Sequence, residues 1–179
     1  MDLRERVVGA REALERLAGA IPGYKGYKEK ELRREADKLL RMHLAQRFEE
    51  QRGRLTGVQS RLVEAGELKA VVALERAMMR LQLLIDRLKT AAYGHAGLFD
   101  VVKVKQEELD ALYNYDYALT QGLAQVSEKV GKLAGATEEG VIIAAADDLV
   151  GVLEGINDTF SRRQDVILGL VEPTSASEG

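Results

Sequence analysis

Two short stretches of the sequence combine residue types that could bind an anion. Residues 21–28 read Ile-Pro-Gly-Tyr-Lys-Gly-Tyr-Lys, and residues 93–100 place two glycines around His95. Glycine lets backbone N–H groups approach a ligand, and lysine supplies positive charge. A long helix is also predicted to begin near Lys28 with the positive end of its dipole. This combination suits a phosphate or a carboxylate, although its spacing matches no phosphate-loop motif.

Asp116 and Arg163 are the other residues with a candidate chemical role. Each interrupts a row of predicted core positions that is otherwise apolar, and tyrosines at 113, 115 and 117 surround Asp116. The expected helix register places the two charges one turn apart, so we predict a buried Asp116–Arg163 ion pair that fixes this register. A ligand-binding or catalytic role for the Asp116 carboxylate is the alternative.

The sequence gives little support to enzyme chemistry. It contains no cysteine, and Leu40 and Ala92 stand three residues before His43 and His95. Neither histidine therefore completes the Glu-x-x-His motif of a di-iron bundle. We predict a non-enzymatic protein with no catalytic residues, no metal and no cofactor.

Long helices must position these residues. The only prolines are Pro22 and Pro173, and apolar residues recur at alternating steps of three and four, which is typical of helices packed along one face. The predicted apolar rows run from Leu3 to Ile21, from Leu32 to Ala65, from Val71 to Ala92, from Leu109 to Leu133 and from Ile142 to Leu170. We predict an all-α, elongated, coiled-coil-like antiparallel bundle of four long helices plus a shorter N-terminal helix. Residues 1–171 would form one domain, and residues 172–179 a disordered tail.

Antiparallel pairing of these helices gathers the unusual stretches at one end of the bundle. This end, which we call the pole, is predicted to contain residues 21–28, residues 93–104 and the end of the last helix. All six tyrosines lie in it or near it. One interpretation is structural, since amphipathic tyrosines could cover an otherwise exposed core. The other is a ligand-binding site, for which the candidate residues are Tyr24, Lys25, Tyr27, Lys28, His95, Asp116 and Arg163.

The third predicted helix, residues 67–92, is apolar over much of its circumference. Its seam includes Val71 and Met78, while Val72, Met79 and Leu83 lie off the seam. A helix of this kind is normally central in its domain. Some apolar surface could nevertheless remain for a second copy or a partner helix.

Charge and hydropathy argue against two classes of function, nucleic-acid binding and membrane spanning. The chain has 26 basic and 29 acidic residues and a net charge of −3, which argues against nucleic-acid binding. We expect the charged residues of the second helix, among them Arg33, Asp37 and Arg41, to form solvated ion pairs. No apolar run is long enough to span a membrane. Binding of the arginine-rich leading helix to a membrane surface is a weak alternative, because its apolar face has no aromatic anchor.

These observations predict a cytoplasmic, non-enzymatic scaffold, adaptor or self-assembling interaction module, with a protein partner or a second copy. The alternative is a small-ligand or anion-binding module, or an enzyme, that uses the pole formed by residues 21–28 and 93–104.

Overall fold

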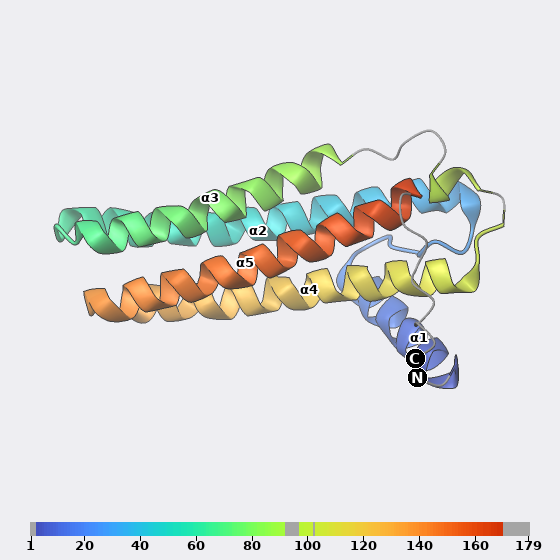
Figure 1. Cartoon of the computed structure of the whole chain (residues 1–179), viewed down its shortest axis with the longest axis horizontal. Coiled ribbons are helices and arrows are strands. Elements are labelled where there is room, and N and C mark those ends of the chain that lie inside the picture. The colour runs from blue at the N-terminus through green and yellow to red at the C-terminus, as the bar shows by residue number, and fades with distance from the viewer. Residues whose placement is uncertain (1–2, 92–96, 102, 170–179) are drawn as a thin grey trace, which may run out of the picture. The chain divides into compact units, whose positions relative to one another are not determined.

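The computed structural model describes residues 3–91, 97–101 and 103–169 and, from residue 9 onward, their side chains. Five α-helices make up most of this part of the chain: α1 (Leu3–Ala20), α2 (Arg33–Glu64), α3 (Leu68–Thr90), α4 (Gln106–Gly135) and α5 (Glu139–Leu168) (Figure 1). Two short 3-10 helices, η1 (Lys30–Leu32) and η2 (Leu98–Asp100), lie in the connections, and the described residues contain no strand. The predicted all-α class, with four long helices and a shorter first one, is confirmed. The predicted disordered tail, residues 172–179, lies outside the described residues.

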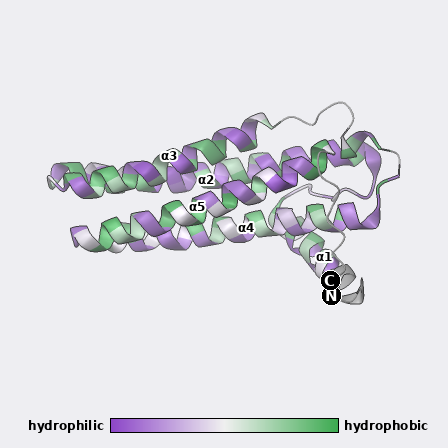
Figure 2. Ribbon diagram, in the orientation of Figure 1, coloured by the Kyte–Doolittle hydropathy of each residue, from purple (hydrophilic) through white to green (hydrophobic). Residues whose placement is uncertain are grey.

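The helices form where apolar residues recur at helical spacing (Figure 2). In α4 this row consists of Leu112, Leu119, Val126, Val130 and Leu133, each at most 1% exposed. One apolar stripe per helix is enough to bury a shared core when several helices pack together. None of the described helices is long and apolar enough to cross a membrane.

Glycine ends α2 as the sequence predicts. Gly66 has a φ angle of 72°, in the left-handed region that glycine adopts without strain. Its N–H donates to the carbonyl of Val63 at 3.1 Å, and the N–H of Glu67 donates to the carbonyl of Leu62 at 3.0 Å. These two bonds satisfy carbonyls at the helix end, as in a Schellman cap, and let the chain turn into α3.

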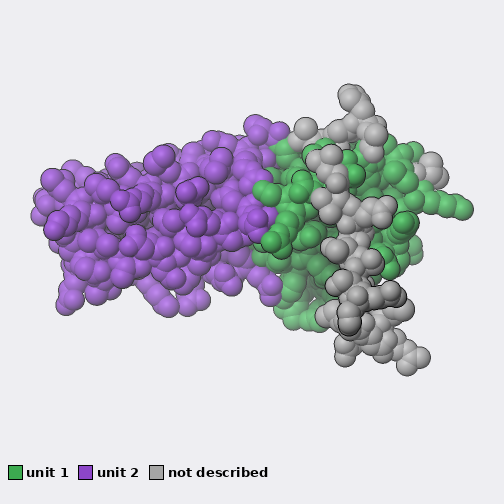
Figure 3. All heavy atoms as spheres, in the orientation of Figure 1, with its two compact units in different colours: residues 1–43, 91–119, 159–179 green, residues 44–90, 120–158 purple. Residues whose placement is uncertain are grey.

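The chain divides into two compact units (Figure 3). Unit 1 comprises Met1–His43, Ala91–Leu119 and Thr159–Gly179, and unit 2 comprises Leu44–Thr90 and Thr120–Asp158. Unit 2 holds all of α3 and parts of α2, α4 and α5, whereas unit 1 holds α1, both 3-10 helices and the remaining parts of α2, α4 and α5.

Unit 2 is a packed arrangement of antiparallel helix pairs. An ion pair between Lys89 and Glu49 joins α3 to α2, and one between Lys129 and Asp148 joins α4 to α5. The side chains of its core that are at most 1% exposed are apolar, among them Leu44, Phe48, Leu55, Leu62, Leu74, Leu81, Leu84, Ile85, Leu88, Val126, Val130, Leu133, Ile142, Ala146, Leu149 and Leu153.

The position of α3 corrects one prediction. Its buried face consists of Ala70, Ala73, Leu74, Ala77, Leu81, Leu84, Ile85 and Leu88. Val71 and Met78, which were expected on the seam, are only half-buried, and Val72, Met79 and Leu83 are exposed. The expectation that α3 is central is therefore wrong. Three alanines and five leucine or isoleucine side chains form the buried face, whereas Val72, Met79 and Leu83 lie outside it.

Candidate functional site

The segment between α1 and η1 depends on two glycines with positive φ angles. Gly23 has a φ of 83° and Gly26 a φ of 80°. A Cβ on Gly26 would lie 2.5 Å from the hydroxyl oxygen of Tyr113 and 2.9 Å from Cδ1 of Leu14. Only glycine combines this conformation with this close approach. As a result the next residue, Tyr27, donates its backbone N–H to the Tyr113 hydroxyl at 2.9 Å.

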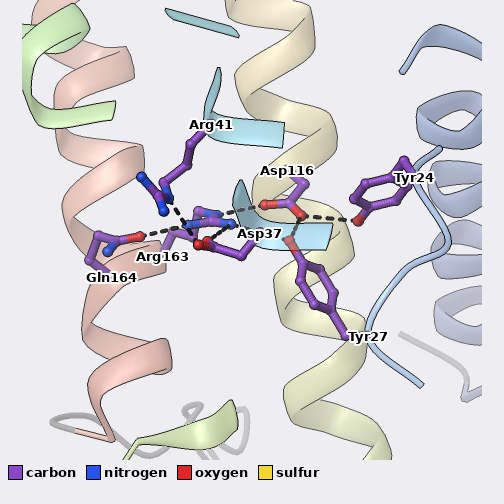
Figure 4. Close-up of polar contacts among 7 residues, drawn as sticks. All are labelled: Tyr24, Tyr27, Asp37, Arg41, Asp116, Arg163 and Gln164. Atoms are coloured by element: carbon purple, nitrogen blue, oxygen red, sulfur yellow. Dashed lines mark hydrogen bonds and ion pairs between the residues drawn. The ribbon is translucent and has the colours of Figure 1, made fainter. Parts of the chain in front are cut away.

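Asp116 lies at the centre of a buried polar network in unit 1 (Figure 4). Arg163 donates from Nε to Asp116 Oδ1 at 2.6 Å, and both side chains are 0% exposed. Tyr24 donates its hydroxyl to Oδ2 at 3.2 Å, and the Tyr27 hydroxyl donates to the same oxygen. The predicted Asp116–Arg163 pair is confirmed, and two tyrosines of the 21–28 segment join it.

Two further charged residues of α2 complete the network. Arg163 donates from Nη2 to Asp37 Oδ1 at 2.6 Å, and Arg41 donates from Nε to Asp37 Oδ2 at 2.9 Å. The side chains of Asp37 and Arg41 are 2% and 5% exposed. Gln164 accepts from Arg163 Nη1 at 2.6 Å. The network thus balances two arginines against two aspartates.

The sequence-based assignment of Arg33, Asp37 and Arg41 to solvated ion pairs is wrong. Arg33 is also buried, and donates to the carbonyls of Tyr27 at 2.8 Å and Val101 at 2.7 Å. The three residues recur every four positions, and each directly follows one of the apolar residues Leu32, Ala36 and Leu40. That adjacency is the signal in the sequence that could have found them, because such a row shares the buried side of the helix.

Burial dominates the electrostatics of the network. It raises the pKa of the Asp116 carboxyl, an effect that the Arg163 guanidinium and the Tyr27 hydroxyl oppose. It also raises the pKa of the Tyr24, Tyr27 and Tyr113 hydroxyls, and the Asp116 charge adds to this rise. Burial opposes the charge on Arg163, but Asp116 and its other neighbours hold the pKa of that guanidinium well above its usual value. These tyrosines are therefore neutral: Tyr24 and Tyr27 donate their hydroxyls to Asp116, and the Tyr113 hydroxyl accepts from the Tyr27 backbone N–H.

The network is closed. Within the described part of the chain, no buried side-chain nitrogen or oxygen lacks a hydrogen-bond partner. The Tyr27 ring also packs against the rings of Tyr24, Phe99 and Tyr113, with centroids 5.5 to 6.0 Å apart. Four of the predicted ligand-binding residues, Tyr24, Tyr27, Asp116 and Arg163, thus satisfy one another and fix the 21–28 segment against α4 and α5.

The two lysines of the predicted site lie elsewhere. Lys25 and Lys28 line a cavity of about 370 Å³ in unit 1, together with Ala10, Arg11, Leu14, Glu29, Leu32, Gln106, Leu109, Asp110 and Tyr113. Tyr113 belongs to both the cavity wall and the surroundings of the network. His95 lies outside the described residues. In the described ranges no group of three or more His, Cys, Asp or Glu side chains could hold a metal ion.

Unit 2 carries a different candidate surface, on the helix for which the sequence left open that some apolar surface could remain for a partner. Four large apolar residues of α3 are exposed: Leu68 by 66%, Val72 by 51%, Met79 by 72% and Leu83 by 46%. Their spacing of four, seven and four places them on one side of the helix, and we name this surface the α3 face. Beside it runs a groove of about 430 Å³ between α3 and α5, lined by Leu68, Lys69, Val72, Ala73, Arg76, Ile143 and Asp147.

Comparison with known proteins identified no relative of this chain. No family model matches it, and no curated protein and no solved structure is significantly similar to it. The fold and these surfaces define an all-α helical bundle with one buried polar network, one partly apolar cavity and one exposed apolar helix face. A functional proposal therefore depends on the chemistry of those features.

Proposed function

We propose that this protein is a non-enzymatic interaction module that binds a protein helix on the α3 face. The observation that carries this proposal is the row of four exposed apolar side chains on one side of α3. Scattered apolar residues on a surface are ordinary, but four of them on one side of one helix, beside a groove, suit a protein-binding surface. An amphipathic partner helix would cover the row and fill the groove between α3 and α5.

The geometry of the row matches what a partner helix needs. From Leu68 to Leu83 it extends over about 22 Å of helix. Charged residues flank the row on both sides. Halfway along it, Glu75 lies on one flank and Arg76 on the other, and both side chains are exposed. Apolar contacts would provide most of the affinity, and the flanking charges would select the partner and its orientation.

Native mass spectrometry of the gently purified protein tests this function. We expect the wild-type chain to carry the mass of a second polypeptide, and Met79→Glu to release it, because a carboxylate would then have to be buried against the partner. Met42→Glu is the matched control, since Met42 is a methionine of α2 that is 42% exposed and lies in unit 1. A bare wild-type monomer, or a complex that survives Met79→Glu, would refute the proposal.

A second candidate function is favoured by the cavity in unit 1. Its wall combines apolar side chains, including Leu14, Leu32 and Leu109, with the basic residues Arg11, Lys25 and Lys28. A volume near 370 Å³ lies within the usual range for small-molecule sites. The three basic side chains outnumber the two acids of the wall, so the ligand class that fits is a carboxylate with an alkyl chain of medium length.

Ligand-induced thermal stabilisation distinguishes this candidate. We expect decanoate to raise the melting temperature more than decanol or decylamine, and Lys28→Glu to reduce this effect. Lys30→Glu is the control, because Lys30 is an exposed lysine of η1 that does not line the cavity. Equal responses to decanoate and decylamine would show that the basic residues do not select the ligand.

A further inference from the structure

We infer that the partner on the α3 face is a second copy of this chain, and that the two α3 helices pair in parallel around a two-fold axis along the helices. This inference rests on the proposed function and names its partner. The observation behind it is the distribution of charge beside the α3 face: one flank is basic and the other is acidic, so two copies can place opposite charges next to each other.

The two flanks of the α3 face carry opposite charge. At 3.6 residues per turn, Arg76 and Lys69 fall on one side of the apolar row, and Glu75 falls on the other. The position of the basic flank agrees with the groove, which Lys69 and Arg76 line together with Ile143 and Asp147 of α5. Glu75 is not part of the groove lining. Each α3 therefore presents a basic edge toward α5 and an acidic edge away from it.

The two charged residues beside the middle of the α3 face, Glu75 and Arg76, form no salt bridge among the described residues. Both side chains are exposed. The neighbouring Arg80 differs, because it pairs with Glu154 of α5 at 3.5 Å. Glu75 and Arg76 are therefore available to a second molecule.

The orientation of the pair follows from these flanks. In a parallel pair with two-fold symmetry, opposite flanks meet, so Arg76 of each copy lies beside Glu75 of the other. The apolar layers then pair each residue of the row with its own counterpart. In an antiparallel pair, identical flanks meet, which brings Glu75 against Glu75 and Arg76 against Arg76. Like charges at such positions weaken association, so the parallel arrangement is favoured.

Charge reversal tests the pairing in solution. Sedimentation velocity over a range of concentrations should show a monomer–dimer equilibrium, with Arg76→Glu and Glu75→Arg each raising the dimer Kd about tenfold, since each replaces two attractions by two repulsions. The double variant Glu75→Arg with Arg76→Glu should restore the wild-type Kd, because the reversed charges pair again. Both positions are exposed, so at a concentration at which all four proteins are monomeric, circular dichroism should show the same helix content and melting temperature in each.

Cross-linking tests the orientation independently. The chain has no cysteine, so any introduced thiol is the only one. Met79→Cys alone should form a disulfide dimer readily if the helices are parallel. A mixture of Val72→Cys and Met79→Cys chains should cross-link to each other only if they are antiparallel, which would overturn the inference.

Two more outcomes separate this inference from the proposed function. If the native mass spectrum shows a different polypeptide that Met79→Glu releases, the α3 face binds a partner but the second copy is wrong. If a dimer forms whose Kd ignores both charge reversals, the module self-associates but the parallel register is wrong. If the wild type is a bare monomer at every concentration, both proposals fail.

Discussion

The buried Asp116–Arg163 pair should be more costly to break than to remove. Replacing Asp116 by leucine leaves the buried guanidinium of Arg163 with only Asp37, which Arg41 also uses, so one positive charge is unbalanced. Breaking a buried pair in this way typically costs about 3–5 kcal/mol. The hydroxyls of Tyr24 and Tyr27 also lose their acceptor. We therefore expect Asp116→Leu to lower the free energy of unfolding by at least about 4 kcal/mol.

The double variant Asp116→Leu with Arg163→Leu should be more stable than either single variant. It removes one charge of each sign, and the remaining Asp37 stays paired with Arg41 at 2.9 Å. Replacing a buried ion pair by apolar side chains is often close to neutral. The two tyrosine hydroxyls without an acceptor set the remaining cost, at about 1–3 kcal/mol each. Adding Tyr24→Phe and Tyr27→Phe should recover part of that cost.

Urea unfolding followed by circular dichroism measures all four steps of this double-mutant cycle. The matched control is the exposed pair of Arg47 and Glu50, 3.2 Å apart and about half exposed. Glu50→Ala should change the free energy of unfolding by less than about 1 kcal/mol. Additive costs of the two leucine substitutions would refute the reasoning, because they would mean that Asp116 and Arg163 do not depend on each other.

Two further predictions concern the ionisation of the buried tyrosines and the backbone conformation of glycine. Burial raises the pKa of the Tyr24, Tyr27 and Tyr113 hydroxyls, so above their ordinary value near pH 10 the unfolded chain holds fewer protons than the folded chain. The free energy of unfolding should therefore be unaffected by these groups below pH 10 and fall above it by about 1.4 kcal/mol per pH unit for each tyrosine. Tyr27→Phe should reduce this slope, and an unchanged slope in urea titrations would contradict the assignment. Gly26→Ala should destabilise the folded protein, because the φ angle of Gly26 is 80° and the new Cβ would lie 2.5 Å from the Tyr113 hydroxyl oxygen. Gly53→Ala is the control, because a Cβ on this glycine of α2 would meet nothing within 4 Å, and it should stabilise the protein by about 0.5–1 kcal/mol. Thermal melting curves of the two variants and the wild type measure both effects.

The sequence was sufficient for features that depend on one helix or on the contrast between neighbouring residues. The steps of three and four determine which segments are helical, and Gly66 and its neighbours define a helix end through local hydrogen bonds. Asp116 and Arg163 could be paired in advance, because each is a charge in a row that is otherwise apolar. A charged residue at such a position must find a partner of opposite sign.

The rest of the network depends on packing that no single helix specifies. Asp37 and Arg41 stand four residues apart, a spacing that also suits a solvated pair on a helix surface. Whether their side of α2 is buried depends on α5, which brings Arg163 within 2.6 Å of Asp37. The α3 face was only partly predictable for a related reason: Val72, Met79 and Leu83 lie off the predicted seam, but whether they are buried depends on the packing of neighbouring helices, which cover the side with Ala70, Leu74 and Leu81.

The two candidate functions can be separated because they depend on residues of different units. The cavity is lined only by residues of unit 1, and the α3 face and its groove only by residues of unit 2. Met79→Glu should therefore abolish assembly and leave the thermal response to decanoate unchanged, while Lys28→Glu should reduce that response and leave assembly unchanged. Loss of both properties in either variant would mean that the two sites are coupled through the helices that contribute to both units. In that case ligand binding would regulate assembly. The Kd of the dimer should then change when decanoate is added to the wild-type protein.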